Sequence, residues 1–207
     1  LMLSVGQGML VSMTQLMHKM GDNMLVVIGG HVHHSRHGFA NGTQVQLSTA
    51  DIGAVKALRG VRRVVPEYVQ TVTIRHGQHK LANQAVVGAV SDYSRLKKMT
   101  LQPDGRFITP LDNQHKAPVI VLGSNIAKNL FPNGHPVGRW VTINNYAVQV
   151  VGVTKNTTQL FRYQPPDVQL TWIPSSTFSG LYSPTSVPVM LVQLDPQANR
   201  DAIKQSI

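Results

Sequence analysis

The chain has 207 residues, no cysteine, and 19 Lys and Arg residues against 9 Asp and Glu residues, which gives a formal net charge of +10. Charged residues make up only 14% of the chain, well below the roughly 25% of a typical soluble domain, so the positive balance reflects a shortage of carboxylates. The 42% hydrophobic content excludes a disordered chain. The absence of cysteine excludes a disulfide framework, a thiol nucleophile and a Cys-ligated metal site.

The N-terminal segment is apolar but does not have the pattern of a membrane span. A spanning helix needs about 20 mostly apolar residues, and polar residues interrupt the uncharged stretch from Leu1 to His18. Apolar residues from Met9 to Met20 recur instead at the spacing of one helix face. We expect residues 1–23 to form a stalk helix in a fragment of a longer protein, following a removed first membrane helix.

Strand and helix signals then alternate in a way that predicts an α+β opening. The predicted elements are a buried strand at Met24–Ile28, a helix capped by Ser48 or Thr49 that runs to Gly60, and strands at Val61–Val65 and Tyr68–Ile74 that are split near Pro66.

A second unit with more strands than helices is predicted to begin near Ala85. Its elements are a strand at Ala85–Val90, a turn or short helix at Ser91–Tyr93, a strand at Val119–Leu122, a helix capped by Ser124 that reaches Leu130, a hairpin of Trp140–Ile143 and Tyr146–Val153, and a strand at Gln169–Ile173. A Ser- and Pro-rich linker at Pro174–Pro188 then leads to a strand at Val189–Leu194 and a helix that begins near Pro196.

Four clustered histidines are the strongest chemical signal: His31, His33, His34 and His37. Neutral imidazoles bind zinc, copper or nickel, and residues at i and i+2 of a strand share a face. No acidic residue lies between Asp22 and Asp51 to support such ligands. Two interpretations therefore remain open, a metal-binding module and a solvated His-rich loop.

The sequence contains no supported catalytic constellation, so a non-enzymatic domain is expected. Asp92, Asp104 and Asp112 are explained by turn chemistry. Ser124 lacks the G-x-S-x-G nucleophile elbow, and no GxxxxGK[ST] phosphate loop occurs, so an ATPase would lie on another domain or chain. The five scattered histidines are predicted to lie at the surface: His18, His76, His79, His115 and His135.

Two groups of cations could attract an anionic partner. They are Arg59, Arg62 and Arg63, and then Arg95, Lys97 and Lys98. Nucleic-acid binding is disfavoured because aromatic residues make up only 6% of the chain and no nucleic-acid motif occurs. An anionic membrane surface and an acidic adaptor protein are the alternatives.

Six short motifs, in order, resemble those of MacB-type ABC-transporter permeases. Ser4–Gly8 is similar to the "SIGEG" that follows the first membrane helix of these permeases, and Gly60–Pro66 to "PGV..V.P". The remaining matches are Ala85–Tyr93, Leu101–Phe107, Val119–Gly123 with Ala127–Phe131, and Pro136–Arg139 with Val150–Val153. The histidines from His31 to His37 replace a Gly-rich loop that is usual in the family.

The resemblance implies the periplasmic core domain between the first two membrane helices of such a permease. It implies a porter-like α/β subdomain made from both chain ends (24–84 and 177–207) with a mostly β subdomain (85–176) inserted in the middle. It also implies a homodimer of the full-length permease, a periplasmic adaptor (membrane fusion) protein, an outer-membrane TolC-like duct, a cytoplasmic ABC ATPase and no cofactor. The domain would couple ATP-driven motion to export of a drug, peptide or lipid-like substrate.

The implied location is the periplasmic side of the inner membrane of a Gram-negative bacterium. Asp and Glu are largely uncharged near pH 3 and below, where they would add little to solubility. The shortage of carboxylates therefore suggests an acidophilic source.

Overall fold

The computed structural model describes residues 23–30, 46–155 and 165–207, which form two compact units. One unit contains the described residues up to Glu67 together with Thr185–Ile207, and the other is Tyr68–Pro184. This is the predicted α+β arrangement, in which both chain ends build one unit and a mostly β unit is inserted between them. The predicted stalk helix and the His-rich segment lie outside the described residues.

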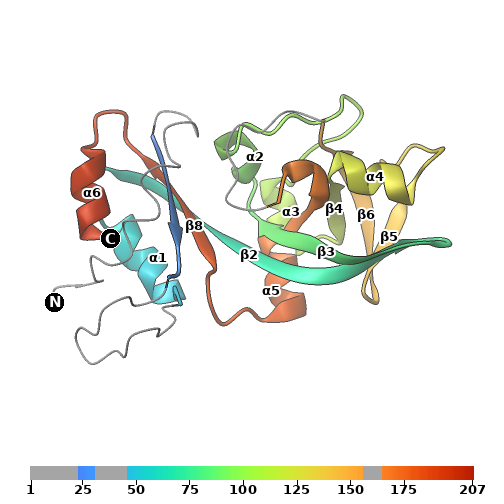
Figure 1. Cartoon of the computed structure of the whole chain (residues 1–207), viewed down its shortest axis with the longest axis horizontal. Helices are drawn as coiled ribbons and strands as arrows, with labels where there is room; N and C mark the ends of the chain where they lie inside the picture. Colours follow the sequence, from blue (N-terminus) through green and yellow to red (C-terminus); the bar gives the residue numbers. More distant parts are fainter. Residues whose placement is uncertain (1–22, 31–45, 156–164) are drawn as a thin grey trace. The chain divides into compact units, whose positions relative to one another are not determined.

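The chain-end unit is a three-stranded antiparallel sheet with two helices (Figure 1). Its elements are β1 (Met24–Ile28), α1 (Thr49–Lys56), the first part of β2 (Val61–His76), β8 (Val189–Leu194) and α6 (Arg200–Ser206). Strand β8 lies between β1 and β2, with Val26 opposite Leu191 and Val65 opposite the same residue on the other side. The two ends of the described chain are therefore joined by backbone hydrogen bonds in one sheet.

Helix α1 begins where the sequence predicts. The hydroxyl of Ser48 accepts a hydrogen bond from the backbone N–H of Asp51, and the Asp51 carboxylate accepts one from the N–H of Ser48 at 2.7 Å. This reciprocal capping box satisfies two of the N–H groups that a helix start leaves without partners.

The inserted unit is a closed six-stranded barrel with short helices. Its strands are the second part of β2, β3 (His79–Ala89), β4 (Val119–Leu122), β5 (Trp140–Ile143), β6 (Tyr146–Val153) and β7 (Leu170–Pro174). The order around the barrel is β2-β3-β7-β4-β6-β5, and β5 pairs back onto β2 through Ile74 opposite Ile143. The helices are α2 (Tyr93–Leu96), α3 (Pro110–Gln114), α4 (Ser124–Leu130), the 3-10 helix η3 (Asp167–Gln169) and α5 (Ser175–Tyr182).

Alternating side chains of the barrel strands fill a single core. Val141 and Ile143 of β5 are buried, whereas Trp140 is exposed and Thr142 is half-buried. The buried set joins residues of β2, β6 and α4 in one cluster, which includes Val72, Ile74, Val148, Val150, Ile126 and Leu130. Strand β7 is buried along its whole length, which is expected of a strand covered on both faces.

Strand β2 is continuous, so the predicted split near Pro66 is wrong. Proline lacks an N–H group and is tolerated in a sheet where the strand has a neighbour on only one side. Pro66 lies opposite Met190 of β8, and β2 begins to pair with β3 only at Tyr68, opposite Gly88. The proline therefore falls just where the strand changes its partner.

The unit boundaries differ from the expected ones because β2 and β3 form one hairpin. Strand β3 begins at His79, six residues before the predicted start at Ala85, and pairs with β2 as far as the turn at Gly77. Both arms of this hairpin belong to the barrel, so the inserted unit begins at Tyr68.

The segment predicted as a Ser- and Pro-rich linker contains α5, whose Phe178 is 1% exposed. Gly88 of β3 makes room for this ring, because a Cβ atom there would lie 2.8 Å from Phe178. Tyr68 and Tyr182 flank Phe178 with ring centroids at 6.0 and 4.9 Å. Because α5 packs on β3, the inserted unit ends at Pro184, beyond the predicted Ser176.

Helix α1 ends at Lys56 rather than near Gly60, and α6 begins at Arg200 rather than near Pro196. Two other helix starts also differ from the prediction. Ser124 does not cap α4: the N-cap is Gly123, and the N–H of Ser124 donates to the hydroxyl of Thr154 at 3.2 Å. Helix α3 was not predicted, although Thr109 and Asp112 form a second capping box around Pro110 at N1. No helix of the described residues is both long and apolar enough to cross a membrane.

Two motif glycines lie against each other. The backbone N–H of Arg106 donates to the carbonyl of Val151 at 2.8 Å, which brings the loop at Gly105 onto strand β6. A Cβ atom on Gly105 would lie 2.6 Å from the Cα atom of Gly152, and one on Gly152 would lie 2.3 Å from the carbonyl oxygen of Arg106. Only backbone atoms are in the way, so the space cannot be opened by a side-chain rotation.

We therefore predict that Gly152→Ala lowers the free energy of unfolding by about 2 kcal/mol or more, the cost typical of overpacking. Urea denaturation of the purified domain measures this. Gly134→Ala is the control, because a Cβ atom there meets nothing within 4 Å. Equal stabilities for the two variants would show that the close approach does not exist.

Candidate functional site

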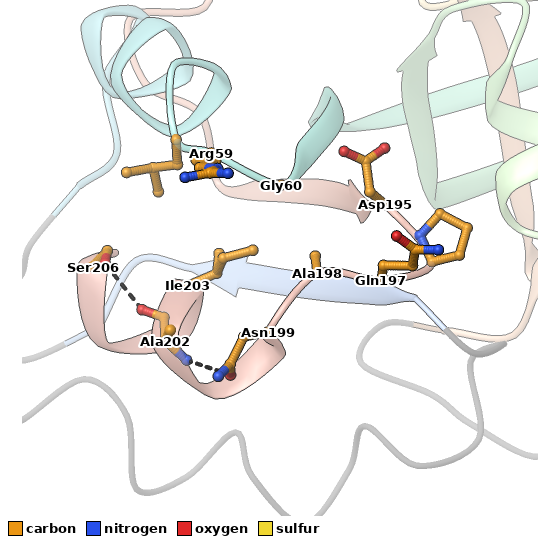
Figure 2. A pocket seen from close by; sticks show the side chains of 11 residues that line it. Arg59, Gly60, Asp195, Gln197, Ala198, Asn199, Ala202, Ile203 and Ser206 are labelled. Carbon is orange, nitrogen blue, oxygen red and sulfur yellow. Dashed lines mark hydrogen bonds between the residues drawn. The ribbon is translucent and has the colours of Figure 1, made fainter.

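A surface pocket of about 800 Å³ lies in the chain-end unit, between the α1–β2 turn and the α6 region (Figure 2). The turn contributes Leu58, Arg59 and Gly60. The other residues come from the end of the chain: Asp195, Pro196, Gln197, Ala198, Asn199, Ala202, Ile203 and Ser206. The pocket thus joins segments that are more than 130 residues apart in the sequence.

Gly60 fixes how closely the two segments approach. Its φ is +88°, a left-handed conformation that favours glycine, and a Cβ atom there would lie 2.9 Å from the Cβ atom of Ala198. The backbone N–H of Asp195 donates to the carbonyl of Gly60 at 2.9 Å. Figure 2 shows Ala198 and Ile203 on the α6 side, facing this turn. The apolar floor of the pocket therefore depends on a glycine of the "PGV"-like motif.

Most of the polar groups near the floor are used by α6 itself. The Asn199 side chain accepts hydrogen bonds from the N–H groups of Asp201 and Ala202, each at 3.1 Å, and the hydroxyl of Ser206 donates to the carbonyl of Ala202 at 2.9 Å. Arg59, Asp195 and Gln197 are the remaining polar side chains of the lining. One cation, one carboxylate and an amide can bind a polar segment of a partner.

A nearly buried ion pair lies in the inserted unit. The Lys97 ammonium is 3.9 Å from a carboxylate oxygen of Asp167, and the two side chains are 9% and 10% exposed. The same ammonium lies 5.7 Å above the ring centroid of Tyr93. Removing one partner of such a pair leaves a buried charge, which is strongly destabilising. Lys97 therefore stabilises the fold of the inserted unit.

A second ion pair joins Arg106 to Asp112 at the start of α3. The guanidinium donates to both carboxylate oxygens, at 2.5 and 3.1 Å, while the same carboxylate accepts from the N–H and hydroxyl of Thr109. Burial raises the pKa of Asp112, but the hydrogen bonds from Arg106 and Thr109 and the positive charge of Arg106 outweigh it. The net result is a pKa below the ordinary value.

The cationic group of Arg95, Lys97 and Lys98 is not a single patch. Lys97 is held by Asp167, and Arg95 is hydrogen-bonded to Asp92. The turn role predicted for Asp92 and Asp112 is not what the structure shows: Asp92 is the N-cap residue of α2 and its carboxylate bonds Arg95, whereas Asp112 belongs to the capping box of α3. In the other group, Arg59 lines the pocket and Arg62 is exposed.

The metal-binding interpretation concerns His31, His33, His34 and His37, which lie outside the described residues. Among the residues that are described, no three His, Asp or Glu side chains are grouped so as to hold a metal ion. The histidine cluster stays a prediction, which calorimetry with zinc and copper tests. Unchanged affinity in His33→Ala and His34→Ala would reject it.

His79, His115 and His135 are exposed, but His76 differs from the surface position predicted for it. Its ring lies 4.1 Å from the ring of Phe131, and its Nδ1 atom is 2.9 Å from the carbonyl oxygen of Trp140. The β2–β5 pairing that creates this contact has no local signal in the sequence.

Comparison with known proteins decides the family. A family model described as the MacB-like periplasmic core domain matches residues 1–207. The chain belongs to this family. It is 32% identical over 155 residues to the macrolide export ATP-binding/permease protein MacB of Rhodospirillum rubrum and 30% identical over 155 residues to that of Wolinella succinogenes. These alignments cover 73% and 75% of the chain and 23% of each relative.

Solved structures show the same fold. The periplasmic region of MacB from Actinobacillus actinomycetemcomitans matches with a TM-score of 0.72 and 18% identity, over 95% of this chain and 86% of that one. The extracellular domain of the transporter YknZ from Gram-positive bacteria matches with a TM-score of 0.63 and 24% identity, over 78% of each chain.

This MacB-like core domain is an extracytoplasmic part of an ABC-transporter permease. It spans about a quarter of the length of the curated relatives that it matches. The motif pieces that carry the resemblance are contact points in the fold, since Gly60 abuts Ala198 and Gly105 abuts Gly152.

The lowered pKa of Asp112 predicts an acid dependence of stability. The ionised carboxylate is favoured in the folded state, so its contribution is present above the unfolded pKa of about 3.9 and is lost as pH falls through the lower folded pKa. We expect the melting temperature of the wild type to fall over this pH range. The melting temperature of Asp112→Asn should be lower than that of the wild type at pH 7 and should change less with pH below pH 4.

Thermal unfolding from pH 7 to pH 2 measures this. Asp104→Asn is the control, because Asp104 is exposed and should leave the wild-type profile unchanged. A wild-type slope retained in Asp112→Asn would assign the acid dependence to other groups.

Proposed function

We propose that this domain couples ATP-driven motion of the permease in the cytoplasm to periplasmic adaptor and efflux partners. The exported substrate would be a drug, peptide or lipid-like molecule, and the relatives are named as macrolide export proteins. The domain itself would perform no chemistry.

The observation that carries the proposal is the pairing of β1 with β8. These strands come from the two ends of the described chain and pair along their full lengths, from Met24 opposite Gln193 to Ile28 opposite Val189. If the first and second membrane helices continue from these ends, any relative movement of the two helices acts directly on this sheet. We also propose that residues 1–23 form the stalk that connects it to the first helix.

Arg200 reinforces the same junction. Its guanidinium donates to the carbonyl of Met24 at 2.7 Å and so ties α6 to the beginning of β1. A hydrogen bond from a charged donor contributes about 1.5–3 kcal/mol, more than most surface contacts. Movement of the chain segment after α6 would thereby reach β1 as well as β8.

ATP hydrolysis would occur elsewhere in the transporter, because the chain contains no phosphate-binding loop. The proposed partners are a second permease copy, a periplasmic adaptor protein, an outer-membrane TolC-like duct and a cytoplasmic ABC ATPase. An adaptor and duct of this kind imply a Gram-negative source.

An acidophilic source is proposed from the shortage of carboxylates. Five of the nine acids lie in the chain-end segments and four in the inserted unit, so few charges are lost on acidification. A fall in stability below about pH 4 that is much larger than the part abolished by Asp112→Asn would contradict this proposal.

The coupling role is tested with Arg200→Ala in the full-length permease. We expect export to fall several-fold while basal ATP hydrolysis stays within about twofold of the wild type, since only the junction is altered. Export and ATP hydrolysis are measured together in proteoliposomes with the adaptor and duct.

Lys204→Ala is the matched control on the same helix, because Lys204 pairs at i,i+3 with Asp201, whose side chain is 84% exposed, and such a pair contributes little. Equal export by Arg200→Ala and Lys204→Ala, or a parallel loss of basal ATP hydrolysis in Arg200→Ala, would contradict the coupling role.

A further inference from the structure

One outer face of the barrel combines two cations with an exposed tryptophan. Arg75 of β2 lies directly opposite Lys80 of β3 on one side and opposite Thr142 of β5 on the other. Trp140 is two residues from Thr142 on β5, so it points to the same side of the strand. We call Arg75, Lys80, Trp140 and Thr142 the tryptophan face. Figure 1 shows the β2–β3 hairpin running beside β5, with which β2 pairs near the end of the strand.

The strand alternation places these side chains outside the barrel. Ile74, Val141 and Ile143 point into the core and are at most 2% exposed. Trp140 is 53% exposed, and Arg75 and Lys80 are exposed. An indole contributes a large apolar area to a contact with little loss of conformational freedom, which is why tryptophan is enriched at the centres of interfaces.

The backbone beneath the indole is held in place. The Nδ1 atom of His76 lies 2.9 Å from the carbonyl oxygen of Trp140, and the His76 ring packs on Phe131, which is 8% exposed. Pairing of Trp140 with Gln149 of β6 holds the other side of β5. A partner would therefore contact an indole on a fixed strand, so little conformational entropy of the backbone would be lost on binding.

The charge around this face is positive and uncompensated by acids of the same unit. The inserted unit carries eleven Lys and Arg residues and four Asp and Glu residues. Three of these acids pair with cations elsewhere in the unit: Asp92 with Arg95, Asp112 with Arg106, and Asp167 with Lys97. The sequence has no Asp or Glu from residue 68 to 91 or from 113 to 166.

Arg75 and Lys80 make no ion pair within the part of the chain that the structure describes, and neither does the neighbouring Arg139. Two like charges directly opposite each other on a sheet are destabilising. An anionic partner that contacts both would remove this repulsion, so the arrangement favours a ligand that carries carboxylates or other anionic groups.

We propose that the tryptophan face docks an acidic segment of a partner protein, with Trp140 as the apolar anchor and Arg75 and Lys80 as the charge contacts. This adds a surface and a partner chemistry to the proposed coupling function, and it rests on that function for the choice of the adaptor as first probe. A second copy of this unit is a poor occupant, because its net charge has the same sign.

Two other anionic occupants fit less well. Binding to an anionic membrane usually takes a cluster of four to eight cations, whereas the tryptophan face contains two, Arg75 and Lys80. Single-stranded nucleic acid is bound by several stacked aromatic side chains along a basic groove. Trp140 is the one exposed tryptophan or phenylalanine among the described residues.

The test measures binding of the purified adaptor to the full-length permease in phosphatidylcholine nanodiscs. We expect Trp140→Ser to weaken binding at least tenfold and Arg75→Glu with Lys80→Glu to lower the association rate and remove its salt dependence. The matched controls are Leu111→Ser, an apolar residue that is 63% exposed elsewhere, and Lys128→Glu with Lys155→Glu, which change the charge equally.

If the wild type binds the adaptor, and the face variants and the control variants weaken that binding equally, the docking face is wrong. The proposed coupling function would not be affected by this result. If the wild type does not bind the adaptor, the partner assignment of the proposed function fails. The docking face is then decided by a synthetic peptide of eight glutamates and two leucines. Weakening of peptide binding only by the face variants supports the proposal, and equal effects overturn it.

The same variants are measured against phosphatidylglycerol vesicles and single-stranded DNA. Weakening confined to either of these probes, with adaptor and peptide binding unchanged, would also overturn the proposal. Because all substituted positions are exposed, the variants are expected to fold, and their melting temperatures check this.

Discussion

The change of partner within strand β2 is the constraint on which the rest of the structure depends. From Val61 to Glu67 the strand pairs with β8, and from Tyr68 to His76 it pairs with β3 and, near its end, with β5. Pro66 has no N–H group to donate, and it lies two residues before this change, where β2 pairs with β8 alone. The chain-end sheet, the closure of the barrel and the contact between His76 and Trp140 all follow from this single strand, because each uses a different part of it.

The sequence predicts secondary structure well where the hydrophobic periodicity agrees with the turn and capping residues. Strands β1, β4, β5, β6 and β8 have the predicted bounds, and the capping box of Ser48 and Asp51 is a local signal with a local cause. The errors arise where a contact between segments distant in the sequence determines the secondary structure. The polar half of β3 is stabilised by pairing with β2 rather than by its own hydrophobicity, and α5 is hidden in a Ser- and Pro-rich segment because its anchor, Phe178, needs the space above Gly88. Thr109, Pro110 and Asp112 do form a local signal for the start of α3.

The candidate sites are likewise predictable only where the signal in the sequence is local. The glycines of the family motifs indicate close approaches, but the sequence does not say which segments meet, so neither the contact of Gly105 with Gly152 nor the pocket below Gly60 could be predicted. The shortage of carboxylates was visible from composition alone. Its meaning in the fold depends on placement, because Asp112 and Asp167 neutralise cations within the inserted unit while Arg75 and Lys80 lie opposite each other on an outer face. Part of the excess positive charge therefore lies on an outer face of the barrel.

The continuity of β2 is the central claim, and cross-strand nuclear Overhauser effects in the isotope-labelled domain test it most directly. The structure predicts contacts between Glu67 and Val189 and between Tyr68 and Gly88 in the same sample, with extended backbone chemical shifts through Pro66. Turn-like chemical shifts at residues 66–68, with both of these contacts missing, would contradict it and would restore two separate strands.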